Sequence, residues 1–449
     1  MKTVCFIANY FKTNVFIEVA KDLSEKGNTI YWITPNKKQY VHLVKEFSDD
    51  AVLYIGKKEV LSAKTHHLSN DLKINELVCG DRVLREEPQE WSFEYLYKLQ
   101  HVYQDFIKAN GIQFIFGELT WAHELLAMRL ANADISLGCR FINPHTIRIP
   151  NGRFAFFTDE FQSVIKENEA ESSNNETPII KAEKPAYLAL NDKFIDKKST
   201  FGHNVKLLMN FMTRANQDAN DVTLYGNPYT QFKIRTREIV NRFLFNKLIS
   251  ETKLEDIPKH KKTILFTLHK QPEASIDVIG RYYENQWTLI KNVWRIMPSG
   301  YVLLVKEHSN AIGDRNMGFY KKVKALKNTF LIDHKVNSYK ILESCAAVFT
   351  VSGTIAYEAA LMGKRSFTFA PTFFNNLKGC SEVSWKDFRN RNIFEEGLDE
   401  SSKMDIQEFS KWLLHNSFEG IMSDSHGDPR CMHKSNIENL SRGFLTIIS

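Results

Sequence analysis

The feature that most constrains this chain is a regular alternation of short apolar runs and amphipathic stretches between residues 263 and 369. Short apolar runs are typical of buried strands, and the stretches between them carry apolar residues at helical spacing. The expected strands are 263–267, 301–305, 329–332, 347–351 and 366–369. The expected helices are about 275–297, 318–326, 338–345 and 354–362. Strands that alternate with helices predict a parallel sheet covered by helices.

The first 150 residues show the same pattern once more. A strand at 3–8, a helix at about 15–26 that ends at Gly27, and a strand at 29–34 form a βαβ unit. A helix at about 92–109, a strand at 113–116, a helix at 121–131 and a strand at 139–142 continue it. The loop 9–14 follows the first strand, where open α/β sheets bind ligands, and it carries no dinucleotide-binding glycine motif.

These two patterns predict an α/β protein with two doubly wound, Rossmann-like domains that face each other across a cleft. A chain of 449 residues is long enough for two or three domains. We place the first domain, with a helical insert, at 1–255 and the second at 256–430. A terminal helix within 431–449 is expected to pack back on the first domain. The segment 167–178 is expected to be a surface loop, and 185–253 is expected to be mostly helical and basic.

Charge and cysteine usage exclude several classes of protein. A net charge of +6 on this length is too small to indicate a nucleic-acid partner, although it suits anionic substrates. The six cysteines are scattered without paired spacing, which argues against a zinc site and against a disulfide framework. The apolar start is too short for a secretion signal, and no stretch approaches a membrane span. We therefore expect a cytoplasmic protein, and peripheral contact with the inner membrane remains open.

Polar residues follow the expected strands of the second domain, and all of them should emerge at one edge of its sheet. They include Gln271, Lys306 and His308. The segment 352–354, Ser-Gly-Thr, opens a helix whose first N–H groups suit a phosphate, and the glycine allows close approach. An ordinary helix cap would use Ser352 or Thr354 in the same way.

Two further side chains complete this expected nucleotide site. His308 can donate to a phosphate oxygen or transfer a proton, because its unperturbed pKa lies near neutrality. Glu358 lies one helical turn after Thr354, among alanines that indicate a buried helix. A buried carboxylate needs partners, and ribose hydroxyls would supply them. The nucleotide-binding set is thus Gln271, Lys306, His308, Ser352, Gly353, Thr354 and Glu358.

In the first domain, Glu118 is the best catalytic candidate, and His308 is the corresponding candidate in the second. Glu118 directly follows an apolar strand, so it should point into the cleft, where a carboxylate can act as a base on an acceptor hydroxyl. Arg148 and Arg153 flank a Pro-Asn-Gly turn and could clamp an anionic sugar or phosphate. Asp81 and Arg82 form a further candidate pair, for which a plain loop salt bridge is the alternative.

The polar segments of the second domain resemble the bacterial capsule polysaccharide synthesis family, which includes Kdo transferases of capsule and lipopolysaccharide assembly. The resemblance is carried by His-Lys-Gln-Pro-Glu at 269–273, Lys-Glu-His at 306–308, and Thr-Val-Ser-Gly-Thr at 350–354 with Glu-Ala at 358–359. It implies a GT-B-like fold with a nucleotide site in the second domain and an acceptor site in the first. The family pattern has Pro after this histidine, and Ser309 stands there instead.

The sequence and the resemblance together predict a glycosyltransferase. The expected donor is a CMP- or UDP-linked sugar, Kdo-like sugars included, and the expected acceptor is a capsule or lipopolysaccharide glycan or glycolipid. Because no Asp-x-Asp motif occurs in a suitable setting, we expect neither a metal nor a cofactor. Helix N–H groups and basic side chains would neutralise the leaving phosphate. The alternatives are a UDP-sugar epimerase or hydrolase, and a non-catalytic protein that binds the polymer during capsule assembly.

Overall fold

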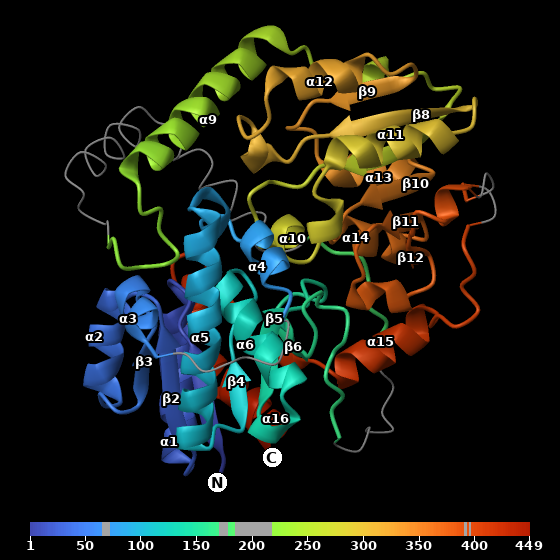
Figure 1. Ribbon diagram of the computed structural model, residues 1–449. Helices are drawn as coiled ribbons and strands as arrows, with labels where there is room; N and C mark the ends of the chain where they lie inside the picture. The colour runs from blue at the N-terminus through green and yellow to red at the C-terminus, as the bar shows by residue number, and fades with distance from the viewer. Residues whose placement is uncertain (65–71, 170–177, 185–217, 390–392, 395–396) are drawn as a thin grey trace.

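The computed structural model describes residues 1–64, 72–169, 178–184, 218–389, 393–394 and 397–449. It confirms the expected α/β class, with two separate sheets that are each covered by helices (Figure 1). The expected loop at 167–178 lies largely outside the described residues. Of the segment 185–253, which was expected to be mostly helical and basic, residues 185–217 lie outside them, and Pro228–Leu248 form a helix. Among the helices that the structure describes, none is both long and apolar enough to cross a membrane.

The first sheet has seven strands in the order β13-β6-β5-β4-β1-β2-β3. The strands β1 to β5 pair in parallel, while β6 pairs antiparallel with both β5 and β13. The hairpin of β5 and β6 was not expected. The bounds are β1 Thr3–Ile7, β2 Thr29–Thr34, β3 Val52–Tyr54, β4 Phe114–Phe116, β5 Arg140–Thr146, β6 Arg153–Phe157 and β13 Phe418–Glu419.

Helices pack on both faces of this sheet. One core lies between the sheet and α4, α5 and α6, and the other lies between the sheet and α1, α2 and α16. The helix α5 ends at Gly111, whose positive φ of 58° favours glycine. The bounds are α1 Lys12–Glu25, α2 Lys37–Glu46, α3 Lys57–Ser62, α4 Ile74–Gly80, α5 Gln89–Asn110, α6 Ala122–Ala133 and α16 Lys434–Ile448.

The second sheet has six strands in the order β12-β11-β10-β7-β8-β9, and all its neighbours pair in parallel. The strands are β7 Lys262–Thr267, β8 Tyr301–Lys306, β9 Thr329–Ile332, β10 Ala347–Thr350, β11 Arg365–Thr368 and β12 Cys380–Glu382. The helices are α9 Pro228–Leu248, α10 Ala274–Asp277, α11 Gln286–Ile296, α12 Met317–Lys324, α13 Ser338–Ser344, α14 Ile355–Leu361 and α15 Ile406–His415.

The prediction of a single long helix at about 275–297 is wrong. The structure has the short helix α10, a 3-10 turn and then α11 in its place. A Cβ on Gly280 would lie 2.5 Å from Cγ1 of Val351, so the chain turns closely past β10 there. Asn285 then starts a new helix, because its side chain accepts a hydrogen bond from the N–H of Thr288.

The chain returns to the first domain at its end. The sequence places this return at residue 431, whereas the structure places it earlier, at β13, which pairs with β6. The helix α16 then packs on α1 and the sheet. Its Phe444 contacts four aromatic rings of the sheet, with ring centroids 4.7–6.4 Å apart: Phe6, Phe116, Phe154 and Phe156.

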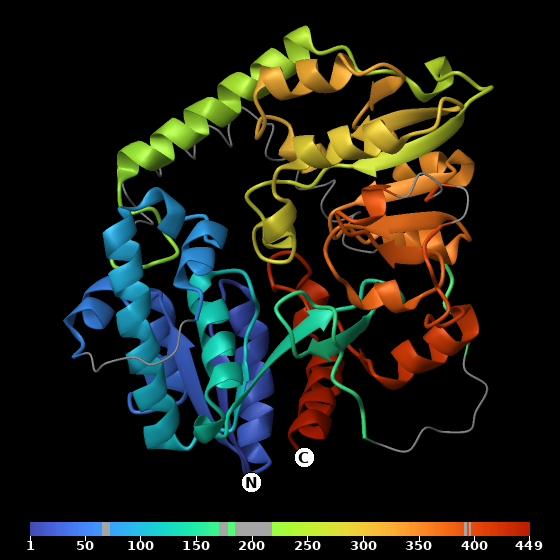
Figure 2. The same cartoon turned by 45° about the vertical axis from the view of Figure 1, so that its right-hand side comes forward.

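The two domains touch through segments that follow the carboxyl ends of their strands (Figure 2). The hydroxyl of Tyr357 in α14 donates to the carbonyl of Ile149, after β5, over 3.2 Å. Arg281, after α10, pairs with Glu76 of α4 and with Glu160. These contacts turn the carboxyl edge of each sheet toward the other domain, which is where parallel sheets present functional side chains.

Candidate functional site

In the first domain, the carboxyl ends of β1, β4 and β5 bring three charged or titratable side chains together. Lys12, in the first turn of α1, forms an ion pair with Glu118, which follows β4. The same ammonium group donates to the carbonyl of Pro144 over 3.3 Å. The Lys12 side chain is buried, whereas that of Glu118 keeps 23% of its exposure, so a ligand can reach the carboxylate. His145 of β5 is the third side chain, and it interacts electrostatically with Glu118 in its protonated form.

The environment keeps Glu118 ionised. Burial alone would raise the pKa of this carboxyl, but the charges of Lys12 and Arg148 outweigh it and hold the pKa below its ordinary value. Burial, followed by the charges of Arg148 and Lys12, lowers the pKa of His145 to about 3. Because Nδ1 of His145 lies 3.0 Å from the carbonyl of Thr146, Nδ1 carries the proton and Nε2 the lone pair. The first domain thus presents a carboxylate beside a neutral imidazole.

The prediction from sequence placed Glu118 at this edge, but it did not single out Lys12 or His145. Lys12 lies in the loop 9–14, which was expected to approach a ligand as a whole. A lysine where the first helix begins, just after the loop that follows the first strand of a doubly wound sheet, is the signal that could have identified it.

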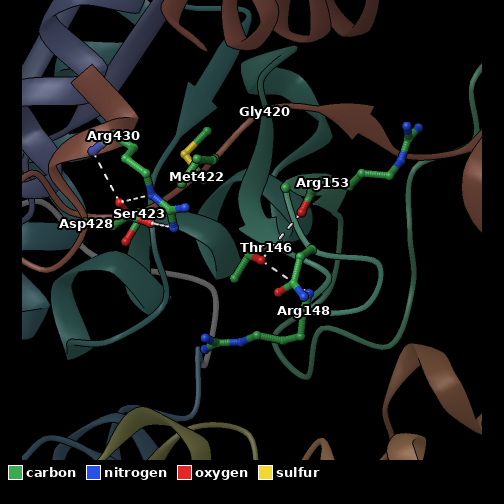
Figure 3. A pocket seen from close by; sticks show the side chains of 11 residues that line it. Thr146, Arg148, Arg153, Gly420, Met422, Ser423, Asp428 and Arg430 are labelled. Atoms are coloured by element: carbon green, nitrogen blue, oxygen red, sulfur yellow. Dashed lines mark hydrogen bonds and ion pairs between the residues drawn. The ribbon is translucent and has the colours of Figure 1, made fainter. Parts of the chain in front are cut away.

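A cavity of about 250 Å³ opens between the β5–β6 turn and the segment that leads to α16. Arg148 and Thr146 line it from one side, and Ser423 and Arg430 line it from the other (Figure 3). Arg430 is held by Asp428, through bonds of 2.8 and 2.7 Å. Arg148, which lines this cavity, also lowers the pKa of Glu118 through its charge.

The expected clamp of Arg148 and Arg153 does not form. Figure 3 shows the two side chains extending in opposite directions. The guanidinium of Arg153 donates to the hydroxyl of Ser417 over 3.0 Å and to the carbonyl of Leu414 over 2.9 Å. Arg153 therefore fixes the chain before β13, because buried carbonyl groups need such donors.

Asp81 and Arg82 have separate partners. The carboxylate of Asp81 accepts from the backbone N–H groups of Val83, Leu84 and Ala122 over 2.8–3.0 Å, which fixes the start of α6. The guanidinium of Arg82 lies 4.4 Å from the ring centre of Trp121.

In the second domain, His269 contacts the residues at the carboxyl end of β10. Its Nε2 lies 2.9 Å from the hydroxyl of Thr350 and 3.3 Å from the N–H of Ser352, which donates to it. Burial lowers the pKa of His269 to about 3, so the ring is neutral. A Cβ on Gly353 would lie 2.7 Å from Oγ1 of Thr350, so this position requires glycine for close packing.

The three residues of the Lys-Glu-His segment after β8 have different contacts. The ammonium of Lys306 donates to the carbonyl of His334 over 3.0 Å. Glu307 is buried and accepts from Arg315 over 2.7 Å and from Tyr320 over 2.8 Å. Nδ1 of His308 accepts from the N–H of Asn310 over 3.2 Å, which leaves Nε2 with the proton. Lys306 and Glu307 thus hold the segment in place, and His308 presents an N–H donor.

The hydroxyl groups expected at a phosphate already have protein partners. Ser352 donates to the carbonyl of Ser275 over 2.7 Å, and Thr354 donates to Glu358 over 3.3 Å. The amide of Gln271 donates to Asp277 over 3.3 Å. Because the N–H of Ser352 donates to His269, the donors of the expected set that are best placed for a ligand are the backbone N–H groups of Gly353 and Thr354 and the ring of His308.

One group of possible metal ligands occurs among the described residues, namely Glu251, Asp333 and His334. Their ligand atoms lie within 4.8 Å of one another. Glu251 already accepts from the N–H and from Nδ1 of His334. The Lys306 ammonium supplies positive charge beside them, so we interpret the group as an ion-pair cluster.

Replacing Glu358 with Gln is expected to flatten the pH dependence of stability. Burial raises the pKa of Glu358 to about 7. Because the unfolded carboxyl titrates near 4.5, the stability is full below that pH and falls as the pH rises toward 7. The loss is on the order of 3 kcal/mol.

Urea unfolding at about pH 5 and about pH 8 measures this difference. In E358Q the difference between the two conditions should shrink, while the exposed Glu343→Gln on the preceding helix should leave it unchanged. Equal pH dependence in E358Q and the parent would contradict the assignment.

The comparison with protein-family models gave no match, and neither did the comparison with curated proteins. Among solved structures, Thermosulfurimonas dismutans KpsC, a beta Kdo 2,7 transferase, is 11% identical with a TM-score of 0.40, covering 100% of both chains. The UDP-GlcNAc 2-epimerase of Methanocaldococcus jannaschii, in complex with UDP-GlcNAc and UDP, is 12% identical with a TM-score of 0.29, covering 92% of this chain and 98% of the other. A putative UDP-N-acetylglucosamine 2-epimerase from Listeria monocytogenes is 10% identical with a TM-score of 0.28, covering 92% and 93%. At these values, the function of this chain must be argued from its own residues.

Proposed function

We propose that this protein is a glycosyltransferase that moves a sugar from a CMP- or UDP-linked donor, a Kdo-like sugar among the candidates, to a capsule or lipopolysaccharide glycan. The observation that carries the proposal is Glu118, an ionised and reachable carboxylate at the carboxyl edge of the first sheet. This edge faces the second domain, whose own edge carries the ring N–H of His308 and the backbone N–H groups of Gly353 and Thr354, which suit a phosphate. Such an arrangement supports transfer between two ligands that are bound by different domains.

In this mechanism Glu118 accepts the proton of the acceptor hydroxyl. The acceptor oxygen forms a bond to the anomeric carbon of the donor sugar, and the bond from that carbon to the phosphate oxygen breaks. The nucleotide leaves with the electron pair. His308 and the N–H groups of Gly353 and Thr354 stabilise its phosphate, and Lys306 adds positive charge behind them. Arg148 is proposed to hold an anionic group of the acceptor in the adjoining cavity.

The test is a thermal-shift screen of the purified protein with CMP, UDP, GDP and TDP, followed by product analysis with the matching sugar donor. Transfer requires an acceptor, so release of nucleotide should increase when an oligosaccharide acceptor is added. Formation of an altered sugar from a UDP-sugar without acceptor would identify an epimerase instead. Binding of a glycan without any nucleotide effect would identify a non-catalytic assembly protein.

Replacing His308 with Asn is expected to weaken nucleotide binding about 10–100-fold, since one hydrogen bond to a charged phosphate is lost. Asn can still accept from the N–H of Asn310 and thereby keep the local turn. Isothermal calorimetry measures the affinity, and thermal unfolding checks the fold.

His308→Ala removes both the ring and this cap, so it should lose affinity and stability together. Unchanged nucleotide affinity in H308N would exclude His308 from the phosphate site.

A further inference from the structure

The long helix α9 lies on the outside of the molecule, where it extends from the side of the first domain to the second (Figures 1 and 2). One side of its second half is attached to the second domain. Asn241 donates to the carbonyl of Gly313 over 3.1 Å, and Phe245 packs on Tyr320 with ring centroids 4.8 Å apart. The opposite side faces solvent.

That solvent side is apolar. Four large side chains are 48–70% exposed, which is unusual for such residues: Tyr229, Ile239, Val240 and Phe243. At about 100° per residue they fall on one side of the helix, and the exposed Thr236 lies between them. We call these four residues the apolar stripe. Exposure of so much apolar surface is unfavourable in water, so the stripe indicates a partner.

Basic residues flank the apolar stripe on both sides. At 3.6 residues per turn, Lys233 and Arg237 fall on one flank, and Arg235 and Arg242 fall on the other. All four are exposed, and Glu238, which pairs with Arg235, is the sole acidic residue within α9. An apolar stripe between two basic flanks matches the boundary of an anionic lipid surface, where rings enter the acyl region and cations meet headgroups.

We propose that α9 binds the surface of a membrane that contains anionic lipids, with the apolar stripe inserted and the basic flanks on the headgroups. A second copy of this chain is the poorer occupant, because two apolar stripes in contact would place the basic flanks of both helices side by side. The site is separate from the proposed nucleotide chemistry, and it stands if that chemistry is wrong.

The test is co-sedimentation of the full chain with vesicles of phosphatidylglycerol and phosphatidylcholine in equal parts, and with vesicles of phosphatidylcholine alone. Binding to the anionic vesicles is expected, with little binding to the neutral ones and a decrease at high salt. Lys233→Gln with Arg237→Gln should weaken binding about five-fold per charge removed. The triple variant Ile239→Ser, Val240→Ser and Phe243→Ser should abolish it.

Ile135→Ser, at an exposed apolar residue of the first domain, is the matched control and should bind like the parent. The thermal midpoints of all variants should stay close to the parent, because the substituted side chains face solvent. Equal binding to both kinds of vesicle, or none, would overturn the proposal. A dimer in sedimentation equilibrium that the triple variant disrupts would overturn it in favour of a second copy.

Discussion

Replacing Glu118 with Gln is expected to lower kcat about 10²–10⁴-fold, while nucleotide affinity stays unchanged. Glutamine keeps the shape of the side chain and still accepts a hydrogen bond from Lys12, but it cannot accept the proton of an acceptor hydroxyl. The nucleotide is proposed to bind in the other domain, so its affinity should not depend on this carboxylate. Turnover with a saturating donor and calorimetry with the nucleotide measure the two quantities.

Glu124→Gln is the matched control, because Glu124 is a buried glutamate just beyond the same strand. Burial raises its pKa to about 8, so the carboxyl is largely neutral at pH 7 and glutamine resembles it. One oxygen accepts from the N–H groups of Thr120 and Trp121 over 2.7 and 3.0 Å, and a glutamine oxygen can keep both bonds. The other oxygen accepts from the side-chain amide of Asn9 over 2.8 Å; if that amide turns over, its oxygen can accept from the glutamine NH2. If E124Q loses as much activity as E118Q, the loss reports a disturbed strand end and not a missing base.

Replacing Arg281 with Met is expected to destabilise the protein by about 3–5 kcal/mol, the largest effect on stability that we predict. Arg281, of the second domain, donates to Glu160 over 2.6 Å and pairs with Glu76. Arg129 of the first domain pairs with the same two carboxylates over 2.6 and 3.1 Å. All four side chains keep 16% of their exposure or less, so the two cations balance the two anions out of water.

Without Arg281, two largely buried carboxylates share one cation. Thermal unfolding should then begin at a lower temperature, and the radius of gyration in solution scattering should increase as the domains separate. Arg295→Met, at a surface arginine of α11, should change neither quantity. Adding Glu76→Gln to R281M should restore part of the stability, since it removes one uncompensated charge. A midpoint in R281M equal to that of R295M would refute this role of the network.

Much of the fold could be predicted from sequence, because buried parallel strands are short, continuous apolar runs. The strands β2 and β9 lie at the expected residues 29–34 and 329–332. The prediction of one helix at about 275–297 was wrong. The apolar spacing of the sequence continues through residue 280, but close packing against Val351 makes the chain turn there. The two-residue strand β13 has no periodicity of its own, and it exists because β6 offers it an edge.

The site was predicted less completely than the fold. Position after a strand was enough to place Glu118 and His308 at the correct edges. The partners of a side chain depend on the path of distant loops, which short-range patterns do not contain. Ser352 donates to a residue 77 positions away, and Arg153 to one 261 positions away. For this reason the hydroxyl groups and Arg153, which were expected to bind a ligand, bind other parts of the protein in the structure.

The place of α16 in the chain has a consequence for synthesis. The strands β1 to β6 and the helices α1 to α6 leave the ribosome early, but the face that α16 covers stays open until the second domain has been made. At roughly 5–20 residues per second, translation from Phe157 to Lys434 takes roughly 15 s or longer. During that interval Phe6, Phe116 and Phe156 lack the ring of Phe444, so the nascent first domain displays an apolar face that chaperones can recognise.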